Sequence, residues 1–205
     1  MIQKNVVTDF SSAEVDPVVD GSAYVHPLAA VIGNVIIGKR VMVAPFASVR
    51  GDEGQPIHVG DESNVQDSVV LHGLETEHNG HPVKENRVTF DLTDYSVYIG
   101  KRVSLAHQVQ VHGPALVDDD TFVGMKSLVF RSYVGMNCVV EPGCIIMGVR
   151  IADGRYVPAG SVIKDQELAD RLPVIDESYA LRHMNREVVH VNTALADSYS
   201  EREKA

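Results

Sequence analysis

The chain has 205 residues, of which 44% are hydrophobic, and its formal net charge is −10 at pH 7. A chain of this length can bury the core of one principal domain. The negative charge argues against nucleic acid or an anionic membrane as partner, because both are bound through basic patches. No apolar run approaches the ~20 residues of a membrane span and no hydrophobic signal segment follows Met1. We therefore expect a cytoplasmic protein, with a processed secreted form as the alternative.

Branched aliphatic residues recur every six residues along most of the chain. They are Val19, Val25, Val31, Ile37, Val43 and Val49, then Val59, Val65 and Leu71, then Ile99, Leu105, Val111, Val117, Val123 and Val129, and after two five-residue steps Val134, Val140, Ile146, Ile151, Val157 and Ile163. Such periodicity is typical of a parallel β-helix, in which three hexads form one triangular coil with the aliphatic side chains inward. An α-helix is excluded, because six-residue spacing drifts around a 3.6-residue turn and leaves no apolar stripe.

The repeat predicts a β-helix domain over residues 1–164, with an inserted loop at about 73–96. From about Asp165 the sequence becomes charged and helix-prone, so residues 165–205 are predicted to form a helical segment packed on the β-helix. Asp176 or Ser178 is expected to cap a final helix from Tyr179 to Tyr199. One face of this helix is expected to pack along the prism through its apolar residues, Tyr179, Leu181, Val188, Val189, Val191 and Leu195.

The repeat is interrupted twice, and interruptions of a solenoid tend to mark its functional surface. The step from Val49 to Val59 holds four residues more than one hexad, and the step from Leu71 to Ile99 holds 22 more. When both insertions are looped out, Val49, Leu71 and Val111 fall on the same face in successive coils. The residues that follow these three therefore form an outward ladder, which consists of Arg50, His72 and His112.

The same count places Gln66 on the preceding face and His107 one step further, around a corner of the prism. Two histidines one coil apart can both reach one ion, because each metal–nitrogen bond is ~2.0–2.1 Å long. His107 can serve an adjacent subunit instead, and a C3 trimer would bring the two faces together. Glu53 and Glu75 stand where a small inward residue is expected, and an unpaired carboxylate cannot enter the core. The chain must therefore leave the coil at both glutamates.

Two segments carry a resemblance to a known family. They read VRGDEGQPIHVGDESNVQDSVVLHGLET and YIGKRVSLAHQVQVHGPA, and the match continues through DGRYVPAGSVI to the C-terminal helix. They resemble the γ-class carbonic anhydrases, especially archaeal-type members with a long acidic loop. The resemblance implies a left-handed β-helix, a homotrimer, and reversible hydration of CO2 to bicarbonate and a proton by metal-bound hydroxide at subunit interfaces. Zn²⁺ is the expected cofactor, with Fe²⁺ or Co²⁺ as alternatives because imidazole suits all three.

The resemblance also implies roles for individual residues. His72 and His112 would bind the metal from one subunit and His107 from its neighbour. Arg50 and Asp52 would form an ion pair across the subunit interface, with an ordinary salt bridge as the alternative.

Five further residues receive catalytic roles from the resemblance. Gln66 would orient the metal-bound hydroxide, with Asn64 and Glu53 beside it. Asn192 would position CO2, and Glu75 would pass protons to buffer. For Asn64, a structural role in a left-handed turn is the alternative.

Three alternatives stay open. His78 and His81 on the long loop can relay protons in place of Glu75, because histidine titrates near neutral pH. The chain can be a catalytically silent scaffold, since relatives act as assembly subunits, although it retains all three histidines and Glu75. A hexapeptide acyltransferase shares the fold but needs no ladder of three histidines.

Overall fold

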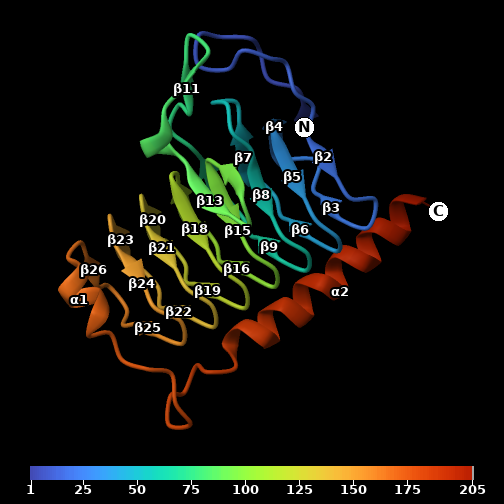
Figure 1. The fold of residues 1–205 in the computed structure, drawn as a ribbon. Coiled ribbons are helices and arrows are strands. Elements are labelled where there is room, and N and C mark those ends of the chain that lie inside the picture. The colour runs from blue at the N-terminus through green and yellow to red at the C-terminus, as the bar shows by residue number, and fades with distance from the viewer. Residues whose placement is uncertain (205) are drawn as a thin grey trace.

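The chain forms a parallel β-helix with a long α-helix along one side, as the computed structural model of residues 1–204 shows (Figure 1). Short strands alternate with turns and wind into stacked coils, so that three parallel sheets form the walls of a prism. This architecture confirms the parallel β-helix that the hexapeptide repeat predicts. Residue 205, the last of the predicted helical segment, lies outside the described residues.

Each sheet takes one strand from each coil. The first sheet comprises β1 (Ile2–Gln3), β4 (Ala30–Gly33), β7 (Ser48–Gly51), β10 (Val70–His72), β17 (Gln110–His112), β20 (Leu128–Phe130), β23 (Ile145–Met147) and β26 (Val162–Ile163). The second comprises β2 (Val18–Val19), β5 (Val35–Ile37), β8 (Ile57–Val59), β15 (Val97–Ile99), β18 (Ala115–Val117), β21 (Tyr133–Val134) and β24 (Arg150–Ile151). The third comprises β3 (Tyr24–Val25), β6 (Met42–Val43), β9 (Asn64–Val65), β16 (Ser104–Leu105), β19 (Phe122–Val123), β22 (Val139–Val140) and β25 (Tyr156–Val157).

Strand pairing keeps the repeated aliphatic residues in register from coil to coil. In the first sheet Leu71 pairs with Val49 on one side and with Val111 on the other. In the third sheet Val65 pairs with Leu105. Both insertions therefore leave the coils and return in the register that the sequence count predicts.

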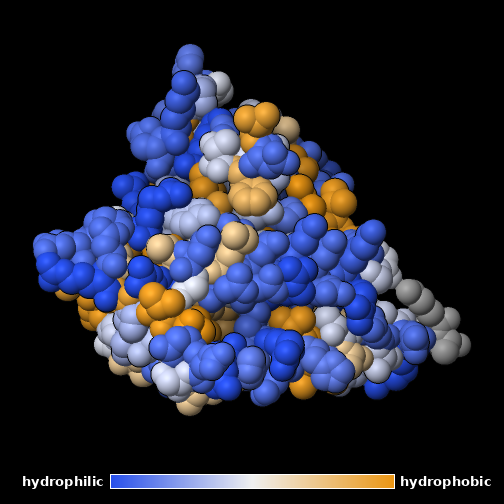
Figure 2. All heavy atoms as spheres, turned by 60° about the horizontal axis from the view of Figure 1, so that its bottom comes forward, coloured by the Kyte–Doolittle hydropathy of each residue, from blue (hydrophilic) through white to orange (hydrophobic). Residues whose placement is uncertain are grey.

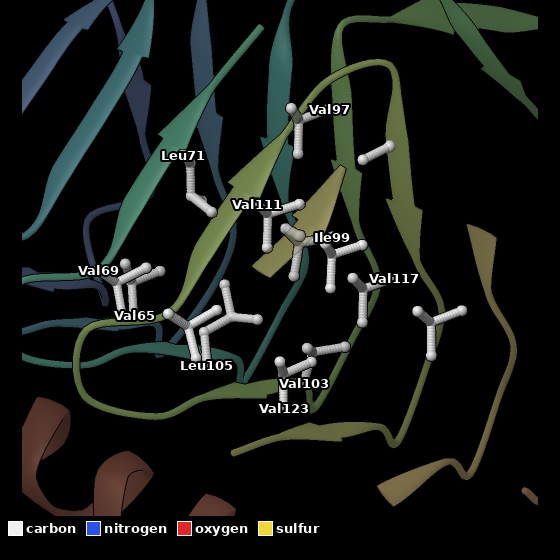
Figure 3. Close-up of a cluster of buried hydrophobic side chains, with 14 of the residues drawn as sticks. Val65, Val69, Leu71, Val97, Ile99, Val103, Leu105, Val111, Val117 and Val123 are labelled. Atoms are coloured by element: carbon white, nitrogen blue, oxygen red, sulfur yellow. The ribbon is translucent and has the colours of Figure 1, made fainter. Parts of the chain in front are cut away.

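The inward aliphatic side chains fill the prism, as Figure 3 shows for its central coils. Leu71, Ile99, Leu105 and Val111 are all 0% exposed. Full burial of such a side chain stabilises the folded state by ~1.5–3 kcal/mol. Because the inward ladder supplies this stabilisation coil by coil, the outward positions are available for chemistry.

Glycine follows the aliphatic residue at several corners because neighbouring coils approach closely there. A Cβ atom built on Gly60 would lie 2.5 Å from the carbonyl oxygen of Gly100. A larger residue at this corner would push the coils apart and break the ladder hydrogen bonds.

The longer insertion projects from the coils near β11 and meets the N-terminal segment there (Figure 1). It carries two antiparallel hairpins, β11 (Glu77–His78) with β12 (His81–Pro82) and β13 (Val88–Phe90) with β14 (Thr93–Tyr95), and a short 3-10 helix at Lys84–Asn86 between them. Ser12 N donates to Glu77 Oε1, and Asn79 N donates to Asp9 O. Figure 2 shows this projection as largely hydrophilic. The contact with the N-terminal segment is a feature that the repeat does not predict.

Two helices follow the last coil. α1 (Gln166–Asp170) is capped by Asp165, whose side chain accepts from Glu167 N. α2 (Met184–Lys204) runs along the third sheet, where it contacts β3, β6, β9 and β16. Neither helix combines the length and apolar character needed to cross a membrane.

The predicted start of the final helix at Tyr179 is wrong. Asp176 Oδ1 accepts from Ser178 N within a turn, and α2 begins only at Met184. The Tyr179 ring stacks on Tyr156 at 4.1 Å. Because this contact holds Tyr179 against the coils, the chain crosses to the third sheet in turns before the helix begins.

The buried stripe of α2 also differs from the predicted one. Its buried positions recur every three or four residues and are Asn185, Val189, Thr193, Ala196 and Ser200. Val191 and Leu195 are instead 55% and 39% exposed. The prediction for these two residues is wrong because three of the five buried positions are polar, and a count of apolar residues misses them.

Candidate metal centre

Two of the predicted metal ligands lie side by side on the first sheet. His72 ends β10, His112 ends β17, and the two residues pair in register. His72 Nδ1 lies 3.4 Å from His112 Nε2. Two ligand atoms that are each ~2.1 Å from one tetrahedral ion lie about 3.4 Å apart. The two nitrogens therefore have the separation that a shared ion requires.

Hydrogen bonds at the other ring nitrogens favour the tautomers that bind metal. His112 Nδ1 lies 3.2 Å from the carbonyl oxygen of Gly113, which can only accept, so Nδ1 carries the proton and Nε2 the lone pair. His107 Nδ1 is 2.9 Å from Asp67 Oδ2, and the His107 side chain is 55% exposed. Burial lowers the pKa of His72, which favours the neutral imidazole that a metal needs.

Charged residues of the shorter insertion surround His72. Arg50 donates to Asp52 Oδ2 through Nε and Nη2, at 3.1 and 3.0 Å. His72 Nε2 lies 3.3 Å from Glu53 Oε1 and 3.5 Å from Asp52 Oδ1. Burial, with Asp52 beside it, raises the pKa of Glu53. Although they are buried, His72 Nε2 and Asp52 Oδ1 have no hydrogen-bond partner in the described part of the chain, which is typical of a site completed by another group.

A second group of predicted residues lies around the corner of the prism, beside α2. Gln66 Nε2 donates to Asn64 Oδ1 at 2.9 Å, and Asn64 Nδ2 donates to Ser104 Oγ at 2.9 Å. All three side chains are buried. Because Nε2 of Gln66 donates to Asn64, the Oε1 atom of the same amide is the one available to accept from another group. Gln66, His107 and Asn192 line one cavity of about 520 Å³ between the third sheet and α2.

The predicted site residues thus form two groups on one chain. The first group consists of Arg50, Asp52, Glu53, His72 and His112, and the second of Asn64, Gln66, His107 and Asn192. Within residues 1–204 no three or more His, Cys, Asp or Glu side chains are placed to hold one metal ion. A site with all three histidines would join the first group of one chain to the second group of another. The Arg50–Asp52 pair forms within the chain, and its version across an interface stays a prediction.

Glu75 lies on the longer insertion, outside both groups but near enough to Glu53 that its charge adds to burial in raising the pKa of Glu53. The Glu75 carboxylate is exposed, and Oε2 lies 3.8 Å from His78 Nδ1. His78 pairs with His81 across the first hairpin, and both are exposed. The three candidate proton carriers therefore share one solvent-facing loop, and the distances do not choose between them.

Two residues that contact the site escape the sequence analysis. Asp67 orients His107, and Ser104 anchors the hydrogen bonds of Gln66. Both lie one coil from the residue they support, so the face count that grouped the histidines could have found them. A count that follows acidic and hydroxyl residues from coil to coil, as well as histidines, identifies both residues.

Comparisons with known proteins identify the family to which the chain belongs. The chain is 55% identical over 98% of its length to the carbonic anhydrase of Methanosarcina thermophila, and the match covers 81% of that protein. It is 40% identical over 94% of its length to the carboxysome assembly protein CcmM of Nostoc sp., of which it spans only 33%. No family model matches the chain.

Similarity to solved structures supports the fold alone. A provisionally assigned acetyltransferase of Bacillus cereus superposes with a TM-score of 0.66 at 20% identity, covering 91% of this chain and 93% of that one. At this identity the likeness carries no argument for acyl transfer. The identity to the Methanosarcina enzyme, over nearly the whole chain, decides the assignment. The chain belongs to the γ-class carbonic anhydrase family.

Proposed function

We propose that the protein catalyses the reversible hydration of CO2 to bicarbonate and a proton, at metal sites between the subunits of a homotrimer. The observation that carries the proposal is the 3.4 Å separation of His72 Nδ1 and His112 Nε2 on one face, with His107 presented on another. Zn²⁺ is the expected ion, and Fe²⁺ or Co²⁺ are alternatives that the same imidazole ligands accept.

The residues fit a divalent ion. His72 and His112 would hold it from one subunit and His107 from the next. In His112 and His107 the other ring nitrogen lies within hydrogen-bond distance of an acceptor, Gly113 O and Asp67 Oδ2 respectively. When bound, the ion supplies Lewis acidity that makes water a nucleophile near neutral pH. A cyclic trimer repeats the same interface three times and so gives three equivalent sites.

The surrounding residues supply orientation and proton transfer. Gln66 Oε1 accepts a hydrogen bond from the attacking group and so fixes its direction, because Asn64 and Ser104 hold the amide in place. Asn192 Nδ2 donates to Val188 O at 2.9 Å, and its second N–H would donate to CO2 from the wall of the same cavity. Glu53, beside His72, takes the proton released at the site, and the exposed Glu75 delivers it to buffer.

Metal reconstitution tests the proposal. Protein stripped with a chelator is reloaded with zinc, or with iron under anaerobic conditions, and CO2 hydration is followed by stopped flow. We expect metal-dependent activity that His112→Ala lowers by at least ~100-fold, since even the loss of a partner that orients a metal ligand costs ~10–100-fold. The Met147→Ala variant, on the same ladder two coils away, is the matched control and should keep full activity.

The similarity to CcmM favours one second candidate, a catalytically silent assembly subunit. The metal reconstitution experiment distinguishes the two functions by one result. Protein that binds one metal ion per chain and still hydrates no CO2 would support the silent subunit, and a search for a partner complex would follow.

A further inference from the structure

Thr76 is a buried residue at the start of the longer insertion, directly after Glu75. It is 0% exposed, although Glu75 before it and His78 after it are exposed. Thr76 N and Oγ1 both donate to the carbonyl oxygen of Glu53, at 3.0 and 2.9 Å. Gln55 N donates to Thr76 Oγ1 at 2.6 Å. One hydroxyl therefore joins the two insertions, as a donor to one backbone group and as an acceptor from another.

The shorter insertion is shaped to close on this hydroxyl. Gly54 lies between the two residues that Thr76 binds, and its φ of 101° is in the region that favours glycine. A Cβ atom built on Gly54 would lie 2.2 Å from Thr76 Oγ1. The close approach of Gly54 to Thr76 Oγ1 and the positive φ of Gly54 are thus two independent observations that both favour glycine where the shorter insertion meets Thr76.

The other side of the Thr76 peptide is held as well. Thr76 O accepts from Arg87 Nε at 3.1 Å and from Arg87 Nη2 at 2.6 Å. Asn86 Nδ2 donates to Glu75 O at 2.8 Å, and Arg131 Nη2 donates to Asn86 Oδ1 at 3.2 Å. The backbone around Glu75 is fixed, while the Glu75 side chain stays 47% exposed.

We infer that Thr76 is a positioning residue whose hydroxyl holds Glu53 and Glu75 in fixed places relative to one another and to His72. The inference rests on the proposed CO2 hydration. Glu53 lies 3.3 Å from His72 Nε2, and Thr76 is bonded to the Glu53 backbone and is the chain neighbour of Glu75. Proton transfer requires donor and acceptor within hydrogen-bond reach, and a ~1 Å displacement can cost up to ~10²-fold in rate. Within residues 1–204 the hydrogen bonds of the Thr76 side chain go to the backbone of the shorter insertion and not to the three histidines, so its role is to position other groups.

Two substitutions of Thr76 distinguish the effect of its hydroxyl group from the effect of its side-chain volume. Thr76→Val keeps the shape and removes both hydroxyl bonds, and Thr76→Ser keeps both. In metal-loaded protein we expect Thr76→Val to lower kcat at low buffer by ~5–10-fold, with imidazole restoring most of it and kcat/KM changing less. Thr76→Ser should stay within about twofold of wild type. Amide hydrogen exchange of the segment 53–58 should rise about tenfold or more in Thr76→Val only, because the Gln55 N–H loses its acceptor.

Thr121→Val is the matched control. Thr121 is equally buried, donates to Gly135 O and accepts from Cys138 N in a regular coil. It should lose comparable stability without any change in kcat or buffer rescue. Equal kcat in the Thr76→Val and Thr76→Ser variants, or unchanged exchange in segment 53–58, would overturn the inference. If wild-type protein hydrates no CO2, the proposed function fails, whereas faster exchange in Thr76→Val would still support the contact.

Discussion

The first sheet has a uniform inward ladder of side chains and an outward ladder whose two halves differ. Inward, the residues Val49, Leu71, Val111, Val129 and Ile146 are all 0% exposed and pair from coil to coil. Outward, the next position reads Arg50, His72, His112, Phe130 and Met147 along the same register. The half with the two insertions carries charge and imidazole, and the uninterrupted half carries apolar side chains.

This difference shows how the fold separates stability from chemistry. The inward side chain stabilises each coil by the same burial, whatever stands outside it. One coil can therefore have histidine, as at His112, where the next has phenylalanine, as at Phe130, with the same burial of the inward side chain. The shorter insertion then brings the carboxylates of Asp52 and Glu53 beside His72, without placing either of them in the core.

The contrast between the two halves of the outward ladder depends on the histidines forming a metal site, and the largest expected effect tests whether that site needs two chains. The His107→Ala and His112→Ala variants should each be inactive alone. When they are coexpressed, about a quarter of the interfaces in random mixed trimers would combine an intact His72–His112 pair with an intact His107. We expect activity and bound metal to return to about that fraction of wild type. Stopped-flow hydration and metal analysis measure both quantities.

Two results would contradict the shared site. No recovery in the mixture would place all ligands within one chain, and a fully metallated His107→Ala protein would remove His107 from the ligand set. Mixing His112→Ala with His72→Ala is the control. Both variants damage the same group, so coexpression should restore nothing.

The longer insertion offers a second, smaller test. Glu75→Ala should lower kcat by ~10-fold or more at low buffer and kcat/KM far less, because proton export and not attack on CO2 is impaired. Imidazole buffer should restore the loss. Glu85→Ala, another exposed glutamate of the same insertion, is the matched control and should leave both constants unchanged. Unchanged kcat in Glu75→Ala at low buffer would shift attention to His78 and His81.

The β-helix was predictable because its signal is long and redundant. Six-residue spacing recurs through every coil, so Leu71 and Val111 could be aligned across a 22-residue insertion by counting alone. The start of α2 was not predictable in this way. It depends on one contact, the stacking of Tyr179 on Tyr156, between a residue beyond the last coil and a residue of β25.

The candidate site was predictable to the extent that it follows the ladder. His72 and His112 come together as counted, and His107 lies around the corner as counted. Contacts between the two insertions could not be counted, because neither insertion has a period. Thr76 therefore looks like an ordinary loop residue in the sequence and is revealed as a junction only when the two loops are seen together.

The second sheet supplies the smallest and most specific test, through His58. Its ring stacks on Tyr98 at 4.7 Å and meets Tyr95 edge-on at 5.8 Å, and Nδ1 lies 3.0 Å from Ile99 O. Burial lowers the pKa of His58 below its ordinary value of 6.5, although Asp61 and Asp119 oppose this and Lys101 adds to it.

The sign of the pH dependence follows from proton binding. Below pH ~6.5 the unfolded chain takes up a proton at His58 that the folded chain does not, so stability falls as the pH drops toward the lower, folded pKa. His58→Phe keeps an aromatic ring in the stack and removes this titration. Urea unfolding between pH 5 and 7.5 should therefore give a shallower decline for His58→Phe than for wild type. His183→Phe, at an exposed turn position, should decline in parallel with wild type. Parallel curves for His58→Phe and wild type would contradict this prediction. They would mean that His58 takes up a proton in the folded protein as readily as in the unfolded chain.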